Sequence, residues 1–397
     1  MKKLLMSGVT ALALAAGAAS AQAEDIKVGV ILGFTGPIES LTPDMAGGAE
    51  MAFAEASESG KLLGGSTVSS VRADSTCVDA AAATAAAERL ITSDKVAAIM
   101  GADCSGVTTA VANNTAVPNG VVMISPSATA PNLTDIEDNG FFFRTAPSDA
   151  RQGVILAETA AARGLKSVAV TYTNNDYGKG LAQAFEAAFT AAGGKVEISA
   201  AHEDGKADYS AEVGALAASG AEALMVFGYV DQGGKGIIEA SIDSGAFDTF
   251  IGSDGMVGDS IIEALGSDIE GFVTTKPSSK AEGADNFIAS ANAAGLKGDG
   301  PFVAQSYDAA ALILLAMQAA GSSDRSAIQA NILNVANAPG EKINPGELGK
   351  ALEILANGGQ VNYEGATGVE LDAVGEAAGV YEEQEVKDGA FATVKFH

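Results

Sequence analysis

The chain has 397 residues, of which 23 are basic and 50 acidic, so its formal net charge at pH 7 is −27. A chain of this length exceeds one ordinary core and predicts two domains. The acidic balance excludes nucleic acid and anionic membrane surfaces as partners, because both repel it. The acidic residues are scattered, which indicates a solvated surface rather than an acidic tail.

The first residues predict a signal for export. Two lysines precede an apolar stretch at residues 4–18, and small residues follow at positions 21 and 23. This order is typical of a secretory signal peptide, which we place at residues 1–23, with cleavage after Ala23. No cysteine follows the cleavage position, so we expect no lipid anchor. The destination is the periplasm.

The chain has only two cysteines, Cys77 and Cys104. In an exported chain an even number suggests a disulfide, which here would close a loop of about 28 residues and stabilise the fold by roughly 3–4 kcal/mol. Two alternatives remain open: a pair of buried free thiols, or a metal site completed by His202. We expect neither a metal nor a cofactor.

In chain order, the first half alternates short apolar strands with alanine-rich helices. Asp79 is a candidate N-cap for one of these helices. We predict strands at 26–32, 68–73, 96–100 and 121–124, and helices at 46–57, 79–91 and 106–116. Strands that alternate with helices of this length predict a parallel sheet.

The alternation resumes after residue 147 and predicts a second α/β unit. The polar stretch at 173–178 is predicted as a loop, and the apolar stretch at 309–317 as part of a buried helix, because a membrane span needs about 20 residues. From residue 361 the tail predicts short strands with Gly and Asp-Gly turns. We predict strands at 167–171, 196–199, 223–227 and 250–252. We predict helices at 181–192, 209–218 and 306–320, and a further helix that ends near residue 244.

Ligands bind open parallel sheets beyond the carboxyl ends of the strands, so the loops there are the candidate binding segments. Ser105 lies where a strand turns into a helix, and it can either bind an anion or merely cap the helix. The loop at 125–131 offers Ser127, Ala128 and Thr129. It can donate to a carboxylate and accept from an ammonium, or serve only as a structural turn.

In the second unit, Tyr177, Tyr229 and Asp254 each lie at or just beyond the end of a predicted strand. A tyrosine can pack on a ligand and offer its hydroxyl, and a carboxylate can pair with a ligand cation. Neither a nucleophile elbow at a strand–helix turn nor a P-loop or His–Glu metal motif occurs. The sequence therefore favours binding over catalysis. An exported hydrolase, which would need a nucleophile and a base in one cleft, is the alternative.

At these loops the sequence resembles the type I periplasmic binding proteins, specifically the leucine/isoleucine/valine-binding receptors of ABC importers. The resemblance rests on segments at 33–37, 104–105, 123–134, 143–145, 176–180 and 363–368. It implies two doubly wound parallel-sheet lobes joined by three crossovers, and it also implies a Cys77–Cys104 disulfide. The implied crossovers lie near 143–147, 274–277 and 370–372, with lobe 1 at 24–144 and 278–370 and lobe 2 at 145–277 and 371–397.

The resemblance also implies a function: a monomeric receptor that captures a small neutral amino acid between its lobes and delivers it to an ABC permease of the inner membrane. The ligand carboxylate would be bound by the first lobe, and tyrosines and an acidic residue of the second lobe would complete the site. The matching residues are Ser105, Ser127, Ala128 and Thr129 in the first lobe and Tyr177, Tyr229 and Asp254 in the second.

Two departures leave the ligand open. Asp254 stands where such receptors often have a longer glutamate, and the chain has no tryptophan to wall the side-chain pocket, where residues 38–41 stand instead. Alternatives within the same fold are a receptor for an amide, a urea-like compound or a small organic or aromatic acid, and a sensory ligand-binding subunit.

Overall fold

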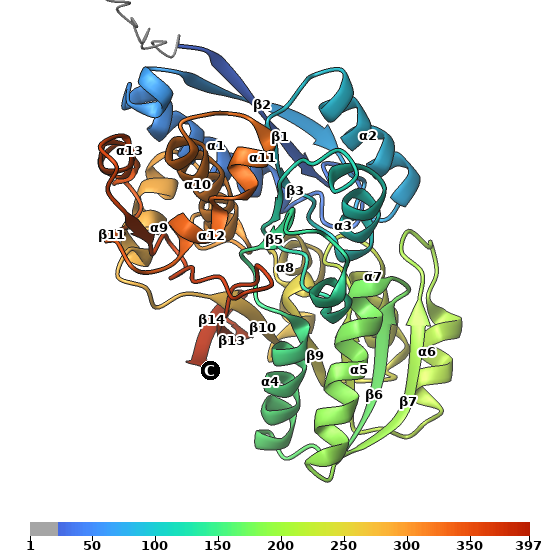
Figure 1. Cartoon of the computed structure of the whole chain (residues 1–397). Helices are drawn as coiled ribbons and strands as arrows, with labels where there is room; N and C mark the ends of the chain where they lie inside the picture. The colour runs from blue at the N-terminus through green and yellow to red at the C-terminus, as the bar shows by residue number, and fades with distance from the viewer. Residues whose placement is uncertain (1–22) are drawn as a thin grey trace, which may run out of the picture.

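The computed structural model describes residues 23–397, and its strands form two large sheets (Figure 1). The predicted signal peptide lies, apart from Ala23, outside the described residues. The first sheet has the order β2-β1-β3-β4-β5, with every pairing parallel. This is a doubly wound order whose switch point lies between β1 and β3. Its strands are β1 (Asp25–Leu32), β2 (Thr67–Asp74), β3 (Ala98–Gly101), β4 (Met123–Ser125) and β5 (Phe142–Arg144).

The second sheet repeats this winding. Its order is β14-β13-β10-β9-β8-β6-β7, so the five strands from β6 to β10 have the same relative order as the first sheet, with the switch point between β6 and β8. Two antiparallel strands, β13 and β14, extend it. The strands are β6 (Ser167–Thr173), β7 (Lys195–His202), β8 (Ala223–Phe227), β9 (Phe250–Gly252), β10 (Val273–Ser278), β13 (Val380–Lys387) and β14 (Ala390–Phe396).

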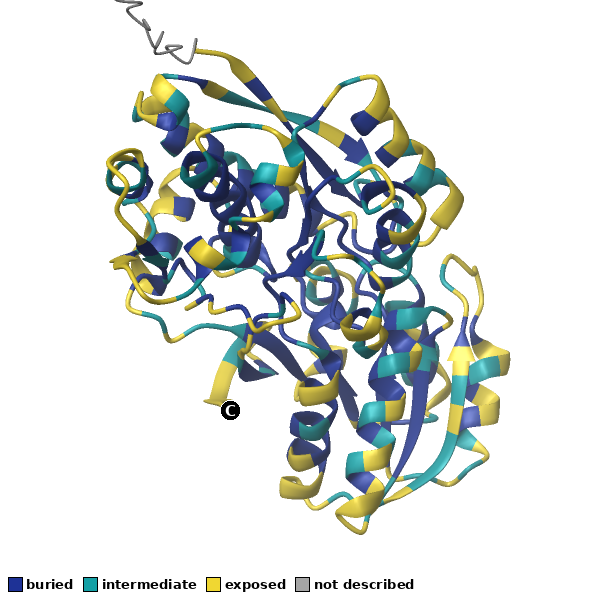
Figure 2. Ribbon diagram, in the orientation of Figure 1, coloured by how far each residue is buried: buried dark blue, intermediate teal, exposed yellow. Residues whose placement is uncertain are grey.

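The strand sequences explain which strands are central. β3 and β8 are continuous apolar runs with every residue buried, as expected for strands covered by helices on both faces. Edge strands β2 and β7 are largely half-buried or exposed (Figure 2). The core therefore forms around the middle of each sheet, and the parallel strands place their carboxyl ends toward one edge.

Helices cover the first sheet from both faces. The Asp79 carboxylate accepts from the Ala81 and Ala82 N–H groups at 2.9 and 3.0 Å, which confirms the predicted N-cap. Among the described residues α10 is the one helix apolar and long enough to cross a membrane, but 83% of it is buried in the fold, as predicted for its central stretch. The helices are α1 (Thr42–Glu58), α2 (Ala80–Thr92), α3 (Ser105–Val111), α9 (Ala284–Ala293), α10 (Val303–Ala320), α11 (Arg325–Gln329), α12 (Ile332–Ala336) and α13 (Leu348–Ala356).

The helices on the second sheet include one boundary that the sequence prediction missed. α5 begins at Asp176, five residues before the predicted start, because the Asn175 side chain accepts from the Gly178 N–H at 3.0 Å and caps the helix there. Tyr177 therefore lies in a helical turn and not in a loop. These helices are α4 (Asp149–Ala162), α5 (Asp176–Ala191), α6 (Ser210–Ala217), α7 (Gly233–Ser244) and α8 (Asp259–Leu265).

The chain passes between the two sheets three times. It leaves the first sheet after β5 and returns after β10. It then forms a small sheet of two strands, β11 (Glu341–Ile343) and β12 (Val361–Tyr363). After β12 it crosses for the third time and enters β13 of the second sheet. Residues 274–277, predicted as the second crossover, belong to β10 itself, so the chain leaves that sheet one residue later. An isolated bridge from Arg144 to Glu376 places the third crossover beside the first, and a second bridge, Leu371 to Ala377, lies within the third crossover.

Candidate ligand-binding cleft

A cavity lies between the two sheets, at the carboxyl ends of their strands, and its void, which opens to solvent, is about 370 Å³. It receives residues from the loops after β1, β3 and β4 on one side and after β6, β8 and β9 on the other. The disulfide between Cys77 and Cys104 joins two of the first-sheet loops at its edge. Five of the seven predicted site residues line the cavity: Ser105, Ser127, Tyr177, Tyr229 and Asp254.

Ser105 and Ser127 present hydroxyl groups from the first sheet. The Ser105 hydroxyl oxygen accepts from the Ala130 N–H at 3.1 Å, which leaves its proton available to an acceptor in the cavity. The Ser127 hydroxyl donates to the Asp103 carbonyl at 3.1 Å. Ser105 is thus the better placed of the two to donate to a ligand.

Ala128 and Thr129, also predicted site residues, are fully buried and do not line the cavity. The Ala128 N–H already donates to the Ser125 hydroxyl at 2.9 Å. The Thr129 hydroxyl donates to the Asp149 carboxylate at 3.0 Å, so its oxygen can only accept from a further group. Thr129 is therefore suited to a ligand cation rather than to a ligand carboxylate.

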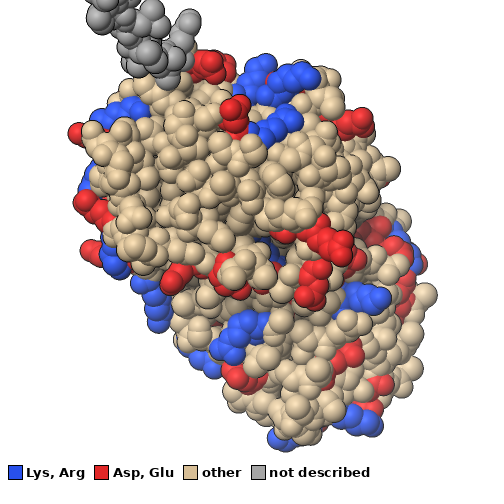
Figure 3. All heavy atoms as spheres, in the orientation of Figure 1, with Lys and Arg blue, Asp and Glu red and all other residues tan. Residues whose placement is uncertain are grey.

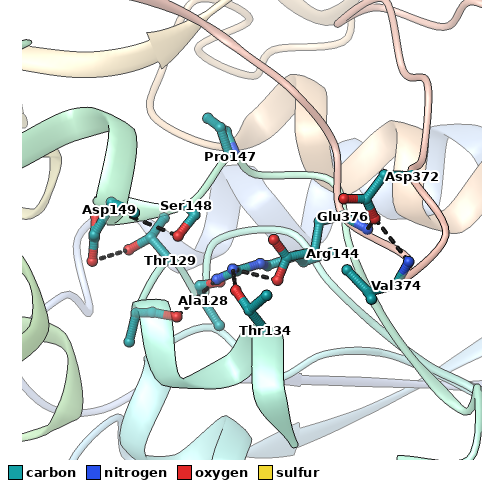
Figure 4. Close-up of polar contacts among 12 residues, drawn as sticks. Ala128, Thr129, Thr134, Arg144, Pro147, Ser148, Asp149, Asp372, Val374 and Glu376 are labelled. Atoms are coloured by element: carbon teal, nitrogen blue, oxygen red, sulfur yellow. Dashed lines mark hydrogen bonds and ion pairs between the residues drawn. The ribbon is translucent and has the colours of Figure 1, made fainter. Parts of the chain in front are cut away.

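The Arg144 side chain lies beside this loop and is hydrogen-bonded to it (Figure 4). Its guanidinium, fully buried, donates to the carbonyl oxygens of Ala128 and Ala130 at 3.2 and 3.0 Å. It also donates to Thr134 and pairs with Glu376 at 2.5 Å. Arg144 thus joins the loop to the third crossover, and its charge is already paired with Glu376.

The second sheet presents a connected group of two tyrosines and a carboxylate. The rings of Tyr177 and Tyr229 stack at 5.3 Å, and the Tyr177 hydroxyl donates to Asp254 Oδ1 at 2.6 Å. Gly255 must be a glycine here, since a Cβ would lie 2.9 Å from the Tyr177 hydroxyl and 2.6 Å from the Gly228 carbonyl oxygen. The Asn175 amide donates to the Tyr229 hydroxyl at 3.1 Å. Each ring is therefore held in place by its neighbours.

Asp254 is 1% exposed. Burial raises the pKa of its carboxyl to about 6, although the donors from Tyr177 and Gly255 favour the charged form. None of its hydrogen-bond partners is a basic side chain. Asp254 therefore lacks a bonded counter-charge.

Asp149 is a second buried carboxylate that the sequence analysis did not single out. Besides the Thr129 contact, its Oδ1 atom has no partner among residues 23–397. Burial, reinforced by the negative charge of Asp254, raises the pKa of Asp149 well above its ordinary value. Asp149 is the first residue of α4, directly after the first crossover, and this position was the one feature of the sequence that could have indicated a site residue.

Apolar side chains wall the rest of the cavity. Ile38 and Leu41 follow β1 and line the cavity, and Met45 adds an unbranched side chain from α1. Phe302 comes from the start of α10, far away in sequence, and no local pattern could have identified it. The wall is thus aliphatic with a single phenylalanine.

The described part of the chain, residues 23–397, contains no group of three or more His, Cys, Asp or Glu placed to hold a metal ion. His202 lies outside the cavity lining, bonded to the Thr171 hydroxyl at 2.8 Å. Burial lowers its pKa to about 4, so the imidazole is neutral at pH 7. Within the described residues, therefore, neither a metal cluster nor His202 places a reactive group in the cleft.

The sequence model of the periplasmic binding proteins matches residues 25–345. This chain belongs to the periplasmic binding protein family. The family consists of solute-binding receptors rather than enzymes, and its name places its members in the periplasm. Its fold, two α/β lobes around a cleft, is the fold described above.

Among its relatives, the chain is 31% identical to the Leu/Ile/Val-binding protein homolog 3 of Brucella melitensis, over 84% of this chain and 89% of that protein. It is 30% identical to the leucine-, isoleucine-, valine-, threonine- and alanine-binding protein of Pseudomonas aeruginosa, over 79% and 84%. The leucine-binding protein of Thermotoga maritima has a similar structure, with a TM-score of 0.78, 26% identity, and coverage of 94% and 98%. A solute-binding protein of R. palustris with bound 4-hydroxybenzoate shares the fold at a TM-score of 0.75 and 23% identity, over 94% and 97%.

Proposed function

We propose that this chain is the solute receptor of an ABC importer and captures a neutral, branched-chain or similarly small amino acid in its cleft. The observation that carries the proposal is the composition of one cavity: a buried carboxylate without a bonded cation, hydroxyl groups of Ser105 and Ser127, and an aliphatic wall. A zwitterion with an aliphatic side chain offers the complementary groups. The names of the relatives support the same ligand class.

In the proposed complex the ligand carboxylate accepts from the Ser105 hydroxyl, with Ser127 beside it. The Ala128–Thr129 turn, whose Ala128 N–H is bonded to Ser125, positions this loop. The ligand ammonium pairs with Asp254, and Thr129 contributes a lone pair. Tyr177 and Tyr229 pack on the ligand from the second sheet. The aliphatic side chain of the ligand lies against the apolar wall.

We propose that residues 24–144 with 278–370 and residues 145–277 with 371–397 move as two lobes. Closure would be a hinge motion at the three crossovers, and the closed receptor, a monomer exported by a signal peptide at 1–23, would dock on its inner-membrane permease. The surface agrees with a freely diffusing acidic receptor: in Figure 3 acidic side chains are scattered over both lobes.

The test is calorimetry of the purified, ligand-stripped protein with each of the twenty amino acids. We expect saturable binding of leucine, isoleucine or valine. If none of the twenty gives heat or raises the melting temperature, the proposal fails.

A small aromatic or other organic acid is the second candidate ligand, since the cleft also carries stacked tyrosines beside hydroxyl donors. The affinity of the Asp254→Ala variant distinguishes these two ligand classes. An amino-acid receptor loses most of its affinity, because the ammonium loses its counter-charge, whereas a receptor for a simple carboxylate such as 4-hydroxybenzoate keeps or gains affinity.

A further inference from the structure

A second cavity lies beside β10, and none of its lining residues belongs to the cleft. One wall comes from β10, β13 and β14 of the second sheet. The other comes from α10, which packs on the first sheet, and from α9, which packs on α10. Its void, which opens to solvent, is about 940 Å³. We call it the hinge pocket and define it by Lys276, Asp285, Phe287, Glu382, Gln384 and Phe391.

The floor of the hinge pocket is polar and buried. Lys276 is 7% exposed, and its ammonium donates to the Asp299 carbonyl at 2.6 Å and lies 3.8 Å from Glu382. Glu382 accepts from the Gln384 amide at 3.1 Å. The side-chain oxygen of Gln384 is buried and has no partner within residues 23–397. A hydrogen-bond donor carried by an occupant would satisfy it.

The charges around the pocket favour a cation. Three lining residues are acidic, Asp285, Asp299 and Glu382, against the single ammonium of Lys276. That ammonium is already committed to a carbonyl oxygen and to Glu382, and burial lowers the pKa of Lys276. The lining residues therefore carry a net negative formal charge, although Asp285 and Asp299 are exposed and Glu382 is the buried carboxylate.

The remaining wall is aromatic. Phe287 is buried on α9, and Phe391 is half-buried on β14. Aromatic rings bury large apolar area and also attract cations with their faces. An occupant thus meets carboxylates and an amide oxygen at the floor and aromatic rings at the side.

We propose that the hinge pocket is a second small-molecule site, which takes an amphipathic amine: a protonated amino group on a compact apolar or aromatic body. The amino group binds at Glu382 and Gln384, and the apolar body packs on Phe287 and Phe391. Because the walls come from both sheets, an occupant contacts both lobes at once. The site does not depend on what the cleft binds.

Phenethylamine is the probe, and phenylacetate is its anionic counterpart. The chain has no tryptophan, so Phe391→Trp introduces a single fluorescent reporter into the pocket. We expect a saturable change of its emission with phenethylamine and at least tenfold weaker binding of phenylacetate. Calorimetry on the unsubstituted protein measures the same affinity without the reporter.

Two variants locate the binding. Glu382→Gln should weaken phenethylamine at least tenfold, because it removes the counter-charge. Asp254→Asn, in the cleft, should leave it within twofold. Melting temperatures and urea midpoints of both variants verify that they are folded.

Three results would overturn the site. They are the absence of saturable phenethylamine binding to the unsubstituted protein, equal affinity for phenylacetate, and loss of phenethylamine binding in Asp254→Asn with retention in Glu382→Gln, which would place the amine in the cleft. A lack of amino-acid binding, by contrast, would refute only the proposed receptor function.

Discussion

Asp149 and Asp254 are two buried carboxylates, and within residues 23–397 no basic side chain is hydrogen-bonded to either. Burial raises the pKa of both, and the nearby guanidinium of Arg144 is committed to two carbonyl oxygens and to Glu376. Removing a charge from water without a partner costs several kcal/mol. A ligand ammonium would offset this cost, which is why we propose that the cleft binds a cationic group.

The first prediction concerns Asp254→Asn, which keeps the shape and removes the charge. Loss of one partner of a buried ion pair costs about 3–5 kcal/mol, so the affinity for the amino acid should fall by roughly 10²–10³-fold or more. Isothermal titration measures it. The matched control is Glu239→Gln on the exposed face of α7, and a similar loss in that control would contradict the assignment.

The second prediction concerns pH. The pKa of Asp254 in the ligand-free protein is about 6, and a ligand ammonium binds the ionised form. As the pH falls through 6 a proton must leave before the ligand binds, so the affinity should be level above pH 7 and fall by up to about tenfold per unit below 6. Titrations between pH 5 and 8 measure this, and Asp254→Asn should show a flatter profile.

At the scale of elements, α10 also carries a buried carboxylate that binds another segment of the chain. Its buried Asp308 accepts from the Tyr363 hydroxyl at 2.8 Å, from the N–H groups of Ala366 and Thr367 at 2.8 and 2.9 Å, and from the Thr367 hydroxyl. One carboxylate therefore holds the segment that follows β12 and leads to the third crossover.

The third prediction is that Asp308→Ala lowers the free energy of unfolding by about 3 kcal/mol or more, because several buried donors lose their acceptor. Tyr363→Phe, which removes one of these bonds, should cost only about 1 kcal/mol. Urea unfolding measures both. Equal losses in the two variants would show that the carboxylate does not act as a shared acceptor.

Element prediction succeeded where the signal was local. The apolar runs of β8 and β9 and the cap at Asp79 were predicted correctly, and so was the Asp-Gly turn between β13 and β14, whose residues Asp388 and Gly389 both have positive φ. The start of α5 was placed too late, because the side-chain cap at Asn175 outweighed the polar composition of the segment.

At the scale of the whole molecule, the Arg144–Glu376 pair joins the first and third crossovers. Arg144 has no exposed side-chain area and Glu376 has 14%. A buried guanidinium needs a bonded carboxylate to offset the cost of removing its charge from water. The pair therefore holds the first and third crossovers against each other.

The fourth prediction follows from this pair. Glu376→Gln should lower the free energy of unfolding by about 2–3 kcal/mol, because a hydrogen bond to a charged group is lost while Arg144 stays buried. The matched control is Glu370→Gln, an exposed residue of the same crossover segment. Chemical denaturation of the two variants measures the difference. If Glu376→Gln is as stable as the control, the pair does not hold the crossovers.

The sequence by itself determined the two α/β units, because strand and helix periodicities are readable without distant contacts. The cysteine count suggested the disulfide, and the loops after strands together with the family resemblance indicated five of the residues that line the cleft. The signal peptide stays a prediction. Only the tertiary structure brought Phe302 and Met45 to the apolar wall and placed Asp149 next to Thr129. It also turned the Thr129 hydroxyl away from carboxylate binding. These features depend on contacts between residues far apart in sequence, which form only when the lobes pack. What a buried donor or charge can bind is set by the partner it contacts, as Asp149 does for Thr129.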